Sequence, residues 1–113
     1  MTRISRLAPA LLMLACTPAL AVADQTGPTI TLTDGVVVPQ TIALPADKAV
    51  TLTVYNTGET AAEFESKRLR IEKIIAPGET ETIQLRALPA GSYPFVEEFH
   101  EDLDTAKGTI VVK

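Results

Sequence analysis

Residues 91–100 read Gly-Ser-Tyr-Pro-Phe-Val-Glu-Glu-Phe-His, and residues 108–113 read Gly-Thr-Ile-Val-Val-Lys. In the first stretch Tyr93, Phe95 and Glu97 fall on one side of an alternating pattern, which predicts a β-strand. The strand runs into a loop that carries His100, the only histidine of the chain, and a last apolar strand closes the domain. If the two aromatic residues point inward, so does Glu97. A buried carboxylate is costly unless it is paired, hydrogen-bonded or bound to a metal.

The rest of the chain is also typical of an all-β protein. Short stretches of β-branched and alternating residues are separated by turn signals rich in proline, glycine and asparagine. The stretch 64–75 is ambiguous, because its middle fits either a helical turn or a loop with Leu69 tucked in. Evenly spaced short strands indicate a Greek-key β-sandwich of about seven strands. The predicted strands are 29–32, 36–38, 41–44, 50–55, 82–86, 92–99 and 109–112.

The N-terminal residues have the organisation of an export signal. Arg3 and Arg6 precede an apolar stretch that ends in Ala-Val-Ala. This stretch is too short, and too interrupted by proline, to predict a membrane span. We expect cleavage after Ala23, which divides the chain into a signal peptide, 1–23, and one domain, 24–113.

The predicted mature chain carries no cysteine, because Cys16 is the only one and lies within the signal. It therefore has no disulfide and no thiolate ligand. We expect a periplasmic protein, and the alternative is a lipoprotein attached through Cys16. Removal of two arginines leaves 8 basic and 14 acidic residues, a net charge of −6. Such acidity argues against a nucleic-acid partner.

Three segments of the domain carry a family resemblance. They are residues 63–66 (EFES), 72–78 (EKIIAPG) and 93–100 (YPFVEEFH). In this order they resemble the cupredoxins, and most closely the cupredoxin-like domains of bacterial iron uptake, the EfeO-type group and the periplasmic partners of Ftr-type ferric permeases. The resemblance implies a cupredoxin-type sandwich. It also implies an inner-membrane iron permease and other periplasmic uptake components as partners.

The resemblance can be carried over residue by residue. Glu63 stands where a cupredoxin has its first histidine ligand, Glu97 stands at the cysteine position, and His100 matches the second histidine. Leu103 falls near the axial methionine and cannot ligate. A blue-copper site needs a cysteine and two histidines, so this sequence excludes it and leaves a harder, oxygen-rich site or none.

We therefore predict a transition-metal site, for copper or iron, made of His100 with Glu63 and Glu97 and completed by Glu65 or Glu72. The alternative is a set of solvated acids beside a surface histidine. The sequence leaves open whether a second copy of the chain completes the site as a homodimer.

The resemblance implies a role in ferrous iron oxidation or ferric iron delivery. One alternative is a metal chaperone without redox turnover, and another is a protein that has lost its site and docks through the acidic segment 97–104. The sequence shows no Ser-His-Asp arrangement and no phosphate-binding loop, and it leaves enzymatic activity undecided.

Overall fold

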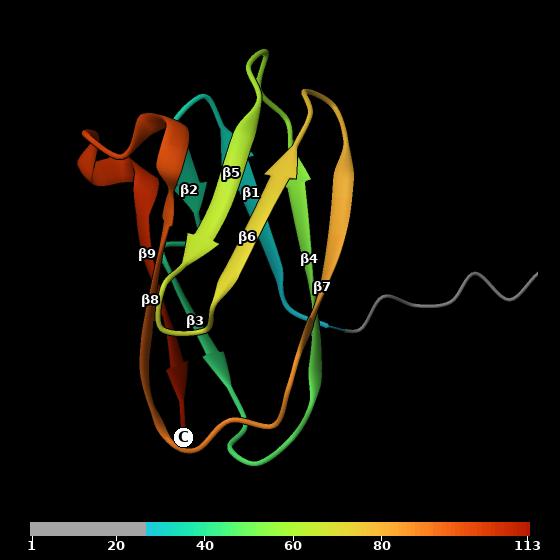
Figure 1. Ribbon diagram of the computed structural model, residues 1–113, viewed down its shortest axis with the longest axis vertical. Helices are drawn as coiled ribbons and strands as arrows, with labels where there is room; N and C mark the ends of the chain where they lie inside the picture. The colour runs from blue at the N-terminus through green and yellow to red at the C-terminus, as the bar shows by residue number, and fades with distance from the viewer. Residues whose placement is uncertain (1–26) are drawn as a thin grey trace, which may run out of the picture.

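The computed structural model describes residues 27–113, so the predicted signal peptide lies outside the described residues. Within residues 27–113, nine strands form two sheets that pack face to face (Figure 1). Sheet A has the order β2 (Val36–Val38), β1 (Thr29–Thr33), β4 (Val50–Asn56), β7 (Thr80–Leu85). Sheet B has the order β3 (Thr41–Leu44), β9 (Lys107–Val112), β8 (Gly91–Glu97), β5 (Ala62–Ser66), β6 (Ile71–Ile75). Within 27–113, no helix is long and apolar enough to cross a membrane.

The connections confirm the predicted β-sandwich. The chain passes from sheet A to sheet B after β2, returns for β4, and crosses again after β4, β6 and β7. The β1–β4 and β3–β9 pairs are parallel and the remaining pairs are antiparallel. Two short 3-10 helices, η1 (Glu98–His100) and η2 (Asp104–Ala106), connect β8 to β9 at one end of the sandwich (Figure 1).

The two strands beyond the predicted seven come from the ambiguous stretch. Residues 62–75 form the hairpin β5–β6, and Leu69 in its turn is buried. Strand β6 lies at the edge of sheet B, and Ile75 is its only fully buried residue. An edge strand that buries so little has no clear alternation of polar and apolar residues, so the pattern did not predict it.

The core lies between the two sheets and is formed by inward side chains from both. Strand β4 contributes Leu52 and Val54, as its alternation predicts. Phe64 of β5 and Phe95 of β8 stack with their ring centroids 4.9 Å apart. Because Phe64 points inward, the glutamates on either side of it point to the outer face of sheet B.

Asp34 ties the β1–β2 turn to the loop between β4 and β5. Its Oδ1 accepts hydrogen bonds from the backbone N–H groups of Glu59 and Thr60 and from the Thr60 hydroxyl, at 2.8–3.1 Å. Asp34 has a φ of 44°, a conformation that aspartate and asparagine tolerate better than other side chains. The Thr60 hydroxyl first, and then the two N–H groups, lower the pKa of Asp34.

We expect Asp34→Asn to lower the melting temperature at neutral pH, because the amide oxygen is a weaker acceptor than the carboxylate. A carboxyl group with a lowered pKa in the folded state stabilises the fold above its unfolded pKa, and this contribution is lost as the pH falls through the folded pKa. The difference between wild type and variant should therefore shrink in acid. Thermal melts by circular dichroism over a pH series measure it, and a difference that grows in acid would contradict this account of Asp34.

Candidate metal centre

Glu97 ends β8 and points into the sandwich, with only 1% of the residue exposed. Its Oε1 accepts the backbone N–H of Glu63 at 3.0 Å and that of Phe99 at 3.1 Å. Its Oε2 is hydrogen-bonded to Nδ1 of His100. The carboxylate is thus satisfied by three neighbouring groups of the protein itself, and no buried side-chain N or O atom within 27–113 lacks a partner.

His100 ends η1, with 26% of its side chain exposed. The β1–β2 turn packs on it so closely that a Cβ on Gly35 would lie 2.9 Å from its Cβ. The pair Glu97–His100 therefore joins β8, η1 and the β1–β2 turn at the end of the sandwich. This arrangement fulfils the expectation that a buried Glu97 needs a partner.

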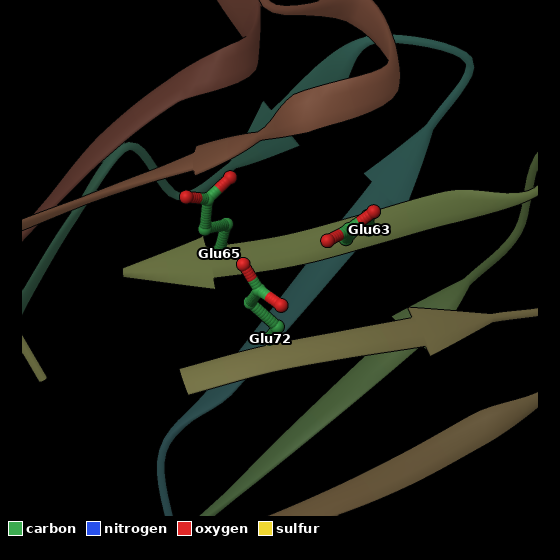
Figure 2. Close-up of side chains that lie close together, drawn as sticks. All are labelled: Glu63, Glu65 and Glu72. Carbon is green, nitrogen blue, oxygen red and sulfur yellow. The ribbon is translucent and has the colours of Figure 1, made fainter. Parts of the chain in front are cut away.

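A second group of carboxylates lies on the outer face of sheet B. One carboxylate oxygen from each of Glu63, Glu65 and Glu72 lies within 4.8 Å of the other two. Figure 2 shows the three side chains close together over β5 and β6. Only 6% of Glu65 is exposed, Glu63 is half-buried and Glu72 is exposed. We call these three residues the carboxylate cluster.

The strand register explains why these three glutamates meet. Glu63 and Glu65 are two residues apart on β5 and so share a face. Glu72 of β6 pairs directly with Glu65. Directly paired residues of an antiparallel sheet have their Cβ atoms about 5 Å apart. The hairpin thus gathers three carboxyl groups at one point of the sheet.

The structure therefore divides the five predicted site residues between two places. Glu63, Glu65 and Glu72 form the carboxylate cluster, and Glu97 and His100 form the inner pair. Glu97 pairs with Phe64 across the strands and shares its inward face, whereas Glu65 pairs with Val96 and faces outward. Sheet B thus separates the two groups.

Glu98 falls in the acidic segment 97–104 of the sequence and outside the predicted metal site, whereas in the structure it extends the carboxylate cluster. Glu98 is hydrogen-bonded to Glu65, and this contact is the largest cause of a raised Glu65 pKa. Burial and the negative charge of Glu98 raise the pKa further, and Lys67 opposes them. The alternation from Glu97 does place Glu98 on the outer side, but only the pairing of β5 with β8 brings it to Glu65.

The donor atoms of the carboxylate cluster suit a hard cation. Carboxylate oxygens favour Mg²⁺, Ca²⁺, Mn²⁺ and iron over soft Cu(I), which prefers sulfur. Three carboxylates within 4.8 Å repel one another, and a bound cation would remove that repulsion. The cluster could hold a divalent or trivalent cation without any sulfur or nitrogen ligand.

Residues 6–112 match the sequence model of the cupredoxin-like domain. The chain belongs to this cupredoxin-like family. An uncharacterized protein of Rickettsia prowazekii is 39% identical over 83 residues, which cover 74% of this chain and 65% of that protein. The chain thus spans about two thirds of the length of this curated relative.

Solved structures share the cupredoxin-like fold. The metal-binding domain of the Cu(I)-exporting P-type ATPase of Streptococcus pneumoniae, solved with Cu(I), has a TM-score of 0.64 at 18% identity, over 75% of this chain and 82% of that one. The purple cupredoxin of Nitrosopumilus maritimus has a TM-score of 0.58 at 15% identity, over 76% and 99%. A Cu(I) form of an amicyanin mutant has a TM-score of 0.64 at 14% identity, over 82% and 87%. At these identities the similarity establishes the fold alone.

Proposed function

We propose that this cupredoxin-like protein is an exported, periplasmic metal-binding component of a bacterial iron uptake system, and that the carboxylate cluster is its metal site. The observation that carries the proposal is the convergence of three carboxylates within 4.8 Å on a domain of a metal-binding family. The export signal predicted from the sequence and the EfeO-type resemblance support the periplasmic and iron-uptake parts of the proposal.

Among the hard cations that suit the carboxylate cluster, the EfeO-type resemblance favours iron, and Cu(II) is the second candidate. Hard oxygen ligands stabilise ferric iron relative to ferrous iron, so binding at the cluster favours oxidation of the bound ion. The exposed position of Glu72 leaves the site open to solvent, as delivery to a permease in the inner membrane requires. The protein would then assist ferrous oxidation or pass ferric iron to the permease.

In this proposal the inner pair, Glu97 with His100, has a structural role. Both oxygens of Glu97 already accept hydrogen bonds from neighbouring groups. A metal bound there would have to displace His100 from a carboxylate that is almost wholly buried. The two places can be separated experimentally, because no residue contributes its carboxylate to both.

Calorimetric titration of the metal-free mature protein with Cu(II), and anaerobically with Fe(II), tests the assignment. We expect one-to-one binding that Glu65→Gln or Glu72→Gln weakens by at least about tenfold, equivalent to about 1.4 kcal/mol. His100→Ala should leave the affinity within a few-fold of wild type. Glu79→Gln, an exposed glutamate in the turn before β7, is the matched control and should change nothing.

Other results of these titrations would change the assignment of the site. Loss of binding in His100→Ala alone would move the site to the inner pair. An absence of heat with every ion would leave the alternative of an interaction module without a metal site. If binding occurs, a ferrous oxidation assay separates a redox role from that of a chaperone, since only the former exceeds the rate without protein.

The affinity for the metal should also decrease as the pH is lowered. Metal ligands must be deprotonated, and the raised pKa of Glu65 means that protons compete at a higher pH than they do for an ordinary glutamate. Titrations at pH 7 and at mildly acidic pH should show this loss, and Glu79→Gln should show the same dependence as wild type.

A further inference from the structure

The outer face of sheet B carries a platform without charge over β8, β9 and β3. Side chains that are directly paired across these strands point to the same side. Pro94, Thr109 and Thr41 form one row of such neighbours. Ser92, Val111 and Ala43 form the next row. We call these six residues the platform, and all are exposed or half-buried.

Opposite charges stand at the two sides of this platform. An open groove of about 750 Å³ includes the row Pro94, Thr109 and Thr41 of the platform, and its charged lining residues are Lys67, Arg68, Glu65, Lys107, Glu101 and Asp102. Arg68 lies beside Ser92 near the start of β8, whereas Glu101 and Asp102 follow η1 beyond the end of β8. Lys67 and Arg68 belong to the β5–β6 turn, and we call them the basic turn. Glu101 and Asp102 follow η1, and we call them the acidic loop. All four residues are exposed.

The acidic loop has no internal counter-charge. Lys107, the nearest base of β9, lies 3.5 Å from Asp104 and not from Glu101 or Asp102. None of the ion pairs within 27–113 includes a residue of the acidic loop or of the basic turn. Arg68 uses its guanidinium to donate to the Ser92 carbonyl and to cover the Tyr93 ring, which fixes its position beside the platform.

We propose that the platform is the interface with a second copy of this chain. Two copies related by a two-fold axis would stack platform on platform. The axis would place the basic turn of each copy against the acidic loop of the other, so that one complementary contact occurs twice. Such self-complementarity is what a closed two-fold interface requires. The uncharged platform supplies the centre, and the opposite charges form the rim.

This arrangement makes the association dependent on salt. The mature chain has a predicted net charge of −6, which opposes self-association in general. The attraction between the basic turn of one copy and the acidic loop of the other must overcome that repulsion at short distances. Salt screens the attraction and the repulsion alike beyond about 8 Å at physiological ionic strength. Exposed pairs contribute little each, so we expect a reversible dimer and not an obligate one.

Sedimentation equilibrium of wild type and of two charge-reversed variants tests the proposal. The first variant carries Lys67→Glu with Arg68→Glu, and the second carries Glu101→Lys with Asp102→Lys. Wild type should approach twice the monomer mass as its concentration rises. Each variant alone should stay monomeric, because its two rims then have the same sign. An equimolar mixture of the two should dimerise again, because one partner is then acidic at both rims and the other is basic.

The mixture separates the proposal from its rivals. Wild type that stays monomeric at low salt, or a mixture that stays monomeric while wild type dimerises, would overturn it. Thr109→Arg at the centre of the platform should also abolish the dimer, whereas Thr82→Arg on the exposed side of β7 should not. Circular dichroism confirms that each variant is folded. The inference does not rest on metal binding, so loss of the carboxylate cluster as a metal site would leave it standing.

Discussion

Replacement of Glu97 by alanine should lower the free energy of unfolding by about 4 kcal/mol. The substitution removes the acceptor of two buried backbone N–H groups, those of Glu63 and Phe99, and the partner of His100. A buried donor left without an acceptor costs about 1–3 kcal/mol, and the space left by the side chain adds to this. Because a domain of this size is stable by only about 5–10 kcal/mol, the variant should be close to unfolding at room temperature.

Glu97→Gln is the matched control for this prediction. The amide oxygen can accept both N–H groups, and the amide nitrogen can donate to Nδ1 of neutral His100 when the imidazole proton is on Nε2. We expect a loss of only about 1 kcal/mol, since the geometry is kept and only the charge is removed. Urea unfolding followed by circular dichroism measures both variants. If alanine and glutamine destabilise the protein equally, the hydrogen bonds to Glu97 do not hold the end of the sandwich together.

The strands that could be predicted are those with one face in the core and one in solvent. Strands β4, β7 and β8 alternate in this way, so the period of two predicts their buried residues, such as Leu52, Ile83 and Phe95. Strand β6 could not be predicted, because an edge strand with one fully buried residue lacks the alternation. The predicted inward position of Glu97 follows from the same period of two.

The candidate site was harder to predict because it depends on register across strands. The sequence does give the alternation of Glu63 and Glu65 about Phe64. It does not give the pairing of Glu65 with Glu72, or the pairing of β5 with β8. These pairings place the carboxylate cluster on one face of sheet B and Glu97 on the other. Neighbouring motifs in the sequence therefore belong to two different places in the fold.

Gly108→Ala is the substitution with the second largest expected effect on stability. Gly108 pairs with Phe95 across β8 and β9, and a Cβ at residue 108 would lie 2.2 Å from Cζ of the Phe95 ring. The ring cannot easily move aside, because it stacks on Phe64 at a centroid distance of 4.9 Å and only 4% of the residue is exposed. We expect a loss of about 3 kcal/mol, at the upper end of the usual cost of overpacking.

A second substitution tests whether the ring is the cause. Phe95→Leu alone should destabilise the protein, because it leaves a cavity beside Phe64. In the double variant the smaller side chain makes room for the new methyl group. The double variant should therefore lose less stability than the sum of the two single losses, by at least about 1 kcal/mol. If the backbone at Gly108, and not the Phe95 ring, excludes a side chain at this position, the two losses should be additive. Urea unfolding of the four proteins of this cycle decides between the two explanations, and it tests the packing that holds β8 and β9 together beneath the platform.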